Sequence, residues 1–260
     1  DALVVIGGNG SLAGARRLGE ESDACVVGIP ASIDNDIACT SNAIGVDTAL
    51  NTIVDACDRI SDTARAHRRV FVVEVMGRHC GYLAMASSVA SGADACLYRE
   101  SGKSDAERVQ ELKEIISRGL DPTRGKQRIL IIKAEGVQLG TQELCNTLQS
   151  YVDAELPGVS VRATVLGHLV RGGKPSYQDR ALAGRLAFQA LDLAMAGIRN
   201  VMLGWQPWDT EGGSPTQDAA VWHFPLALVE SRTKSLLDGS HPTTKRRVQM
   251  MESIAGVLAV

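Results

Sequence analysis

Two aspartates, Asp34 and Asp36, are separated by one polar residue in a loop that a proline introduces. One carboxylate of such a pair can accept a proton from a reacting hydroxyl, while the other helps to hold a cation. An Asx turn or a helix cap explains one aspartate, but it explains two of them less naturally. We therefore interpret the pair as the core of a candidate catalytic loop.

The glycine-rich segment Gly7–Ser11 follows the first apolar run and precedes a stretch of helical period. Adjacent glycines let backbone N–H groups approach a phosphate, and a helix N-terminus favours negative charge. The same region also fits a dinucleotide fingerprint, because Gly8, Gly10 and Ala13 are spaced as G-x-G-x-x-A and Asp34 follows. A tight turn with positive φ is the plain structural alternative. This loop alone leaves all three interpretations open.

Charged side chains follow further strand candidates. Arg78 ends one of them, where a guanidinium can bind phosphate oxygens. His168 and Arg171 are three residues apart in a glycine-bounded loop, which favours anion binding. Glu135 could bind a hydroxyl, and a turn carboxylate explains it nearly as well. Arg69 lies at the opposite end of the Arg78 strand, roughly 20 Å away if extended, so a surface ion pair explains it better.

One segment imitates a phosphate-binding loop. Ser101–Ser104 reads Ser-Gly-Lys-Ser, like the end of a Walker A motif, but the glycine that this motif requires is replaced by Leu97. We predict a turn that caps the next helix.

These loops need a framework, and the sequence predicts short strands that alternate with longer helices. The predicted strands cover Ala2–Ile6, Ala24–Ile29, Val70–Val75, Ala95–Tyr98, Arg128–Ile132, Val161–Val165 and Val201–Trp205. The predicted helices cover Leu12–Glu21, Val46–Ala66, Gly81–Ala90, Ala106–Ser117, Gln142–Val152 and Gln178–Ala196. The strand candidates are continuous apolar runs, which is typical of parallel sheets buried on both faces. Ligands of such sheets bind beyond the carboxyl ends of the strands.

Composition excludes several classes of protein. The 260 residues are 45% hydrophobic and 22% charged with a net charge of −3, which is typical of a globular domain and makes nucleic acid an unexpected partner. No apolar run is long enough for a membrane span, so no membrane association is expected. The six cysteines lack metal-ligand spacing, which favours the reduced thiols of a cytoplasmic protein.

Taken together, the loops resemble the phosphofructokinase family in order and in spacing. The segments that carry the resemblance are Gly7–Ser11, Gly28–Asp36, Val72–Arg78 and Leu166–Gly173. The resemblance implies an α/β fold of two lobes, each with a mainly parallel sheet flanked by helices. It assigns residues 1–45 and 170–220 to a nucleotide-binding lobe, and residues 46–169 and 221–260 to a sugar-phosphate-binding lobe.

The implied reaction is transfer of a phosphoryl group from MgATP to the 1-hydroxyl of fructose 6-phosphate, a step of glycolysis. Asp34 matches the general base of the family and Asp36 its second carboxylate, associated with Mg²⁺; Arg78 completes the candidate catalytic set. The nucleotide loop is matched by Gly8, Asn9, Gly10 and Ser11. The contacts to the sugar phosphate are matched by Ser32, Met76, Gly77, Arg78, Glu135, His168 and Arg171.

Two further arginines carry an implication about assembly. Arg69 and Arg162 match residues that reach the sugar phosphate of a neighbouring subunit in the family. This implication removes the distance problem of Arg69, and it predicts a homo-oligomer, usually a tetramer.

The chain also departs from the family pattern. Asn9 stands at a metal-associated position where the family usually has Asp, and an amide cannot offset a divalent charge. Gly10 and Ala31 stand where pyrophosphate-using relatives tend to have Asp and Lys, which favours ATP as the donor. The first residue, Asp1, begins a strand directly, and we expect a truncated sequence. The family segment before this point carries a second nucleotide loop, so these 260 residues alone are expected to be inactive.

Three rival functions stay open from the sequence: a non-catalytic regulatory homologue that binds sugar phosphate or nucleotide, a pyrophosphate-dependent phosphofructokinase, and a nicotinamide-dependent oxidoreductase. Asn9 supports the first. The third leaves the aspartate pair and the loop of His168 and Arg171 without linked roles.

Overall fold

The structure is a computed structural model that describes residues 1–258, except the side chains of residues 65–67 and 256–258. The chain divides into two compact units: unit 1 comprises residues 1–48 and 174–245, and unit 2 comprises residues 49–173 and 246–260. Residues 221–245 therefore belong with residues 1–48, and our expectation that they join the other lobe is wrong. The reason is that the strand Val221–Pro225 pairs with Val201–Trp205.

Unit 1 is built on a five-stranded sheet in the order β1-β2-β7-β9-β8. Its strands are β1 (Ala2–Gly7), β2 (Cys25–Pro30), β7 (Val201–Trp205), β8 (Ser214–Pro215) and β9 (Val221–Pro225). The first three are parallel, whereas β9 pairs antiparallel with both β7 and β8. We did not predict β8 and β9, because two residues, Ser214–Pro215, carry no period and Val221–Pro225 interrupts its apolar residues with His223.

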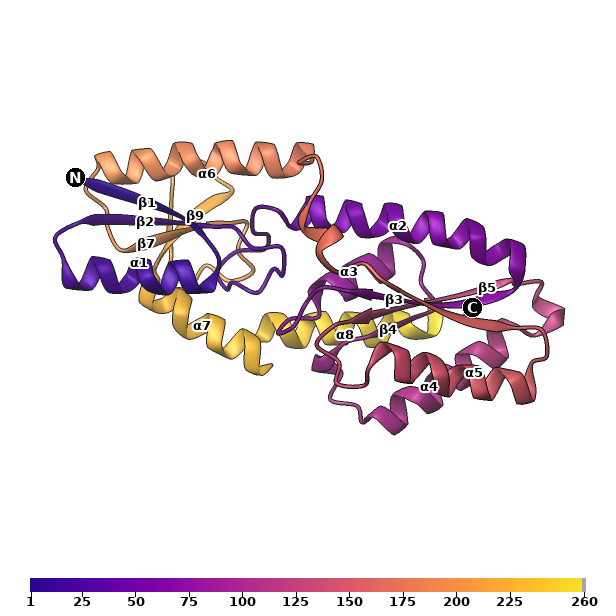
Figure 1. Cartoon of the computed structure of the whole chain (residues 1–260). Coiled ribbons are helices and arrows are strands. Elements are labelled where there is room, and N and C mark those ends of the chain that lie inside the picture. The colour runs from indigo at the N-terminus through magenta and orange to yellow at the C-terminus, as the bar shows by residue number, and fades with distance from the viewer. Residues whose placement is uncertain (259–260) are drawn as a thin grey trace. The chain divides into compact units, whose positions relative to one another are not determined.

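Helices cover both faces of this sheet. They are α1 (Asn9–Glu21), α6 (Tyr177–Met195) and α7 (Leu226–Asp238). Figure 1 shows α6 on one face, with α1 and α7 on the other. One half of the core joins Leu186 and Leu193 of α6 to Val27 and Leu203, and the other joins Leu12 of α1 to residues of α7 and β7.

Unit 2 contains a four-stranded sheet in the order β4-β5-β3-β6, and every pairing in it is parallel. Its strands are β3 (Arg69–Val75), β4 (Ala95–Leu97), β5 (Arg128–Ala134) and β6 (Ser160–Val165). The central strands β3 and β5 are almost wholly buried, as their continuous apolar runs predict. The fold class expected from the sequence is confirmed.

The helices of unit 2 again lie on both faces of the sheet. They are α2 (Val46–His67), which begins in unit 1, α3 (Tyr82–Ala90), α4 (Asp105–Gly119), α5 (Thr141–Glu155) and α8 (Pro242–Leu258), with 3₁₀ turns η1 (Arg99–Ser101), η2 (Pro122–Arg124) and η3 (Gly167–Arg171). Figure 1 shows α4 and α5 on the side of the sheet opposite α2 and α3. The main core packs Leu112 and Ile116 of α4 and Leu148 of α5 against Val72 and Ile131.

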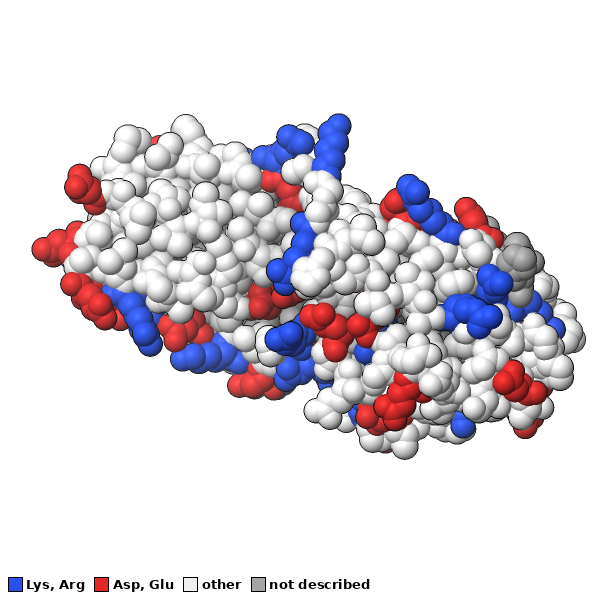
Figure 2. Space-filling model, viewed as in Figure 1, with Lys and Arg blue, Asp and Glu red and all other residues white. Residues whose placement is uncertain are grey.

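Acidic and basic side chains are interspersed on the face of unit 2 shown in Figure 2, whereas the visible face of unit 1 is largely uncharged. Exposed apolar residues of unit 1 include Ile6, Phe188 and Met195. Among the described residues, no helix is long and apolar enough to cross a membrane. The six cysteines all lie in the described part of the chain, and none of them forms a disulfide bond.

Candidate functional site

The end of β1 leads almost directly into α1. The helix begins at Asn9, three residues before the predicted start, and Gly8 is its N-cap. The first turn therefore contains Asn9, Gly10 and Ser11, whose backbone N–H groups have no partner within the helix. Gly7 must lack a side chain, because a Cβ there would lie 2.5 Å from the Ser11 hydroxyl. A helix N-terminus formed by small residues is suited to bind a phosphate.

The two aspartates lie in the long loop after β2, residues 31–45, which we call the carboxylate loop. Asn9 Nδ2 donates to Asp36 Oδ2 at 2.7 Å, and Ser32 Oγ donates to Asp36 Oδ1 at 3.0 Å. The backbone N–H of Ala31 also donates to the Gly7 carbonyl at 3.0 Å. The structure thus brings Asp36, Ser32 and Asn9 together, at the carboxyl ends of β1 and β2.

The return limb of the carboxylate loop is tied to the sheet of unit 1. Ser41 donates to the Trp205 carbonyl from its backbone N–H at 2.9 Å and from its hydroxyl at 2.8 Å. Thr40 Oγ1 accepts from the Trp205 N–H at 3.0 Å, and the Ile44 N–H donates to the Pro30 carbonyl at 3.0 Å. Sequence reasoning missed these residues, because Thr and Ser carry no recognisable spacing here.

Asp179 is a second group that the sequence did not reveal. It is only 4% exposed and accepts hydrogen bonds from the backbone N–H groups of Gly45 and Thr48, both at 2.8 Å. Its own backbone N–H is capped by Ser176 Oγ at 3.2 Å. One buried carboxylate of α6 therefore holds the start of α2 and the end of the carboxylate loop.

In unit 2, the loops that follow β3, β5 and β6 leave the sheet at the carboxyl ends of these parallel strands. We call residues 76–78, 135–136 and 167–171 the strand-end loops. The Glu135 N–H donates to the Val75 carbonyl at 2.9 Å. Gly136 lies against the backbone of Arg78, since a Cβ there would be 2.3 Å from the Arg78 carbonyl oxygen. Gly77 has φ +126°, a conformation that favours glycine.

Most of the side chains predicted to contact the sugar phosphate lie at these strand ends, whereas Ser32 lies in the carboxylate loop of unit 1. Arg171 Nε donates to Met76 Sδ at 3.4 Å. Four polar side chains of the strand-end loops are exposed, namely Arg78, Glu135, His168 and Arg171. Three of them can carry positive charge, which suits an anion.

An ion pair between a buried lysine and a partly buried glutamate lies beneath the strand-end loops. Lys133 is 1% exposed, and its Nζ donates to Glu74 Oε2 at 3.0 Å. The hydroxyl of Thr141 donates to the same Glu74 oxygen. The pair joins the penultimate residues of β3 and β5. We did not identify it from the sequence, because two charges inside separate apolar runs show no mutual spacing.

Arg69 and Arg162 are placed together by the register of β3 and β6. Arg69 pairs with Ser160 and Arg162 pairs with Phe71, so both arginines lie on one face of the sheet, two residues apart in register. Arg162 Nη1 donates to the Val161 carbonyl at 2.8 Å. Arg69 begins β3, at the end opposite to Arg78, as predicted.

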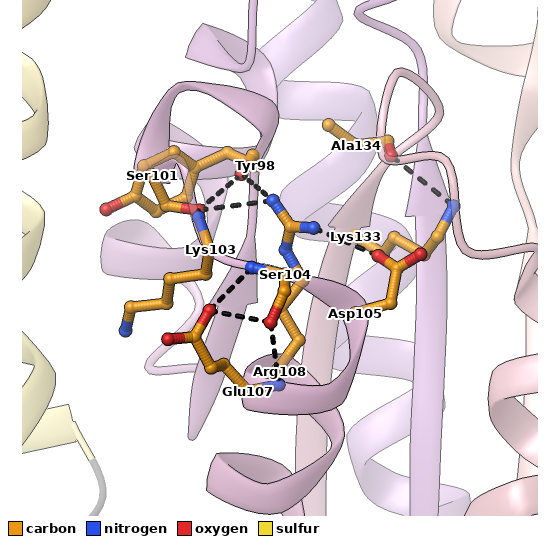
Figure 3. A network of polar contacts seen from close by, with 9 residues as sticks. All are labelled: Tyr98, Ser101, Lys103, Ser104, Asp105, Glu107, Arg108, Lys133 and Ala134. Atoms are coloured by element: carbon orange, nitrogen blue, oxygen red, sulfur yellow. Dashed lines mark hydrogen bonds and ion pairs between the residues drawn. The ribbon is translucent and has the colours of Figure 1, made fainter.

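The Walker-like segment caps a helix, as predicted. Figure 3 shows the hydroxyl of Ser104 accepting from the Glu107 N–H while the Glu107 carboxylate accepts from the Ser104 N–H, a capping box that begins α4. Arg108 Nη2 donates to the Tyr98 carbonyl and to Ser101 Oγ. The segment stabilises the start of α4, so its resemblance to a P-loop is accidental.

The side chains of unit 1 provide one carboxylate suited to magnesium. Magnesium prefers oxygen ligands and is usually held by one or two carboxylates together with substrate phosphates. Asp36 fits this pattern, whereas Asn9 turns its amide nitrogen towards Asp36. No group of three or more His, Cys, Asp or Glu side chains that could hold a metal occurs among the described residues.

Comparisons with known proteins show the family of the chain. The family model described as Phosphofructokinase matches residues 1–194. The chain belongs to the phosphofructokinase family. It is 45% identical over 204 residues to an ATP-dependent 6-phosphofructokinase 2 of Bacteroides thetaiotaomicron, and equally identical to an ATP-dependent 6-phosphofructokinase of Clostridium botulinum. Each alignment covers 78% of this chain and 60% of the relative, so the chain spans about three fifths of these relatives.

Solved phosphofructokinase structures share the fold. The enzyme of Saccharomyces cerevisiae superposes with a TM-score of 0.78 and 27% identity, covering 98% of this chain and 37% of that one. A pyrophosphate-dependent phosphofructokinase of Marinobacter aquaeolei superposes with a TM-score of 0.68 and 21% identity, covering 88% of this chain and 59% of that one, and shows the fold alone.

Proposed function

We propose that the protein containing this chain is an ATP-dependent 6-phosphofructokinase, which transfers the γ-phosphoryl group of ATP to the 1-hydroxyl of fructose 6-phosphate. The observation that carries the proposal is the hydrogen bond from Asn9 to Asp36, because it joins a phosphate-binding helix N-terminus to the carboxylate loop within one unit. Relatives named as ATP-dependent enzymes at 45% identity support ATP as the donor.

The residues of unit 1 serve the nucleotide and the proton. The first-turn N–H groups of Asn9, Gly10 and Ser11 bind the phosphates, and Asp34 accepts the proton of the attacking hydroxyl. Asp36 is the carboxylate ligand available to magnesium, which when bound neutralises charge on the transferring group. Asn9 then acts as a donor that orients Asp36.

The residues of unit 2 hold the sugar phosphate. Arg78, His168 and Arg171 supply positive charge and N–H donors, while Glu135 accepts from a sugar hydroxyl. Arg69 and Arg162 reach the sugar phosphate of a neighbouring subunit, which makes the working protein a homo-oligomer. This assignment uses positioning and charge neutralisation, the main sources of catalysis in phosphoryl transfer.

The test is turnover by a form of the protein as long as its relatives. Phosphorus NMR should show fructose 1,6-bisphosphate appearing with ATP and magnesium, and far more slowly with pyrophosphate. Binding of fructose 6-phosphate without turnover would instead support a regulatory homologue, which the amide at Asn9 also favours. Preferential binding of NAD(H) over ATP would favour the oxidoreductase. We expect the 260 residues alone to show little or no turnover.

A further inference from the structure

Asn35, the residue between the two aspartates, has a buried side chain and an unusual backbone. Its side chain is 1% exposed and its φ is +48°. Residues other than glycine seldom adopt this left-handed conformation, although Asn tolerates it better than most. A buried polar residue held in such a conformation needs a local cause.

That cause is a pair of hydrogen bonds across the carboxylate loop. Asn35 Nδ2 donates to the Ser41 carbonyl at 2.9 Å, and Asn35 Oδ1 accepts from the Ala43 N–H at 3.2 Å. Ala43 is fully buried. The amide of Asn35 therefore replaces a backbone pairing between the outgoing and the returning limbs of the loop.

The returning limb is itself fixed, so the constraint reaches the sheet. Ser41 is bound to the Trp205 carbonyl of β7, and Ile44 is bound to the Pro30 carbonyl of β2. Asp34 and Asp36 flank Asn35 on the outgoing limb, so the anchor of Asn35 restrains the backbone from which both carboxylates project. On the other side, Asp36 is held by Asn9 and Ser32.

We propose that Asn35 is a positioning residue: its buried amide fixes the backbone from which Asp34 and Asp36 project, without contacting a substrate. This inference rests on the proposed function, since the positioning serves phosphoryl transfer. Displacement of a reacting group by about 1 Å can lower a rate by about 100-fold. Loss of the Asn35 amide should therefore lower kcat rather than weaken substrate binding.

The chain offers a matched control. Asn200 lies in the same unit with φ +61°, and its Nδ2 donates to the Gly19 carbonyl at 3.0 Å. It therefore combines the same backbone conformation with the same kind of anchor, next to β7 and outside the carboxylate loop. Replacement by glycine keeps the left-handed backbone and removes only the amide at either position.

The experiment compares Asn35→Gly, Asn35→Asp and Asn200→Gly in a form as long as the relatives. We expect both Asn35 variants to lower kcat by about 100-fold with KM for fructose 6-phosphate and ATP changed less than about threefold. Asn35→Asp should behave like Asn35→Gly, because a carboxylate cannot donate to the Ser41 carbonyl. Asn200→Gly should lower the urea midpoint of unfolding by about as much as Asn35→Gly does. Its kcat, however, should stay within about twofold of the wild-type value.

Hydrogen exchange gives a readout that does not need activity. In Asn35→Gly, peptides covering residues 31–45 should exchange faster, because Ala43 loses its acceptor. If the wild-type protein is active and Asn35→Gly has the same kcat, the inference is wrong. It is also wrong if Asn200→Gly loses as much kcat as Asn35→Gly. A wild-type protein without turnover refutes the proposed function itself, and unchanged exchange in Asn35→Gly refutes the anchor.

Discussion

The carboxylate loop of unit 1 and the strand-end loops of unit 2 are held by different chemistry. The carboxylate loop makes a long excursion, and neutral groups such as Asn35, Thr40 and Ser41 fasten it to backbone atoms, while the single carboxylate of Asp179 holds its last residue. The strand-end loops continue the pairing of β3 and β5, and the ion pair of buried Lys133 with partly buried Glu74 supports them.

This difference agrees with the roles that we propose. A proton acceptor must be held in one direction near its hydroxyl, and several directional hydrogen bonds achieve that. An anion site needs positive charge at the surface, and exposed side chains such as Arg78 and Arg171 on short loops provide it. We therefore expect the stability of unit 2 to depend on the ion pair of Lys133 with Glu74 more than the stability of unit 1 depends on any ion pair.

The largest expected change in stability comes from Lys133→Met. Lys133→Met leaves the Glu74 carboxylate, whose side chain is 20% exposed, without its cation. Loss of one partner from a fully buried pair destabilises by about 3–5 kcal/mol, so for this partly exposed partner we expect a loss of about 3 kcal/mol. Urea unfolding followed by far-UV circular dichroism should show this loss. The double variant Lys133→Met/Glu74→Gln should recover most of it, because no unpaired charge remains. A single variant as stable as wild type would contradict the comparison.

A smaller loss is expected when the buried cap of α2 is weakened. Asp179→Asn keeps the shape of the side chain but turns an amide N–H towards one of the two backbone donors, Gly45 or Thr48, and should cost about 1–3 kcal/mol. The matched control is Asp55→Asn on α2 itself. The side chain of Asp55 is 64% exposed and pairs with Arg59. Equal urea midpoints for the two variants would show that the cap contributes nothing.

The smallest effects concern pH and should differ between the units. Burial raises the pKa of the Cys57 and Cys145 thiols to about 11 and that of Cys96 to about 12. Unfolded thiols lose their protons first, near the ordinary pKa of 9.0, so unit 2 should lose stability as the pH rises from about 9. In unit 1, burial lowers the pKa of His223 from its ordinary 6.5, so stability should fall as the pH drops below that value.

These shifts can be measured separately. The three tryptophans, Trp205, Trp208 and Trp222, all belong to unit 1, so their fluorescence follows that unit, whereas far-UV circular dichroism follows both. The fluorescence midpoint in urea should fall between pH 7 and pH 5.5, and the dichroism midpoint should fall above pH 9. A fluorescence midpoint independent of pH in the acid range would refute the role of His223.

Much of this architecture could be predicted from the sequence. The apolar runs gave seven strands, with ends mostly within one or two residues, because a strand buried on both faces must be continuously apolar. The strand Val221–Pro225 was not predicted, since its place in the sheet depends on tertiary pairing with β7. The sequence also does not show that Arg247 of α8 is buried: it is 9% exposed, and its guanidinium lies 4.4 Å from the Tyr82 ring centroid.

The residues of the candidate site also fall into those that the sequence reveals and those that it does not. Residues in recognisable spacings, such as Asp34, Asp36 and His168, could be selected from the sequence, because motif and strand end coincide. Their supports, such as Asn35 and Asp179, could not, since each acts through backbone groups far along the chain or across a loop, and no local pattern records that contact.

The most direct test of the account is the rate of Asp34→Asn in a form as long as the relatives, with fructose 6-phosphate, ATP and magnesium. An amide keeps the shape of the side chain but cannot accept the hydroxyl proton, so we expect kcat to fall by about 100- to 10,000-fold while fructose 6-phosphate still binds. An Asp34→Asn protein that turns over within a few-fold of wild type would show that another group takes the proton, and the proposed mechanism would be wrong.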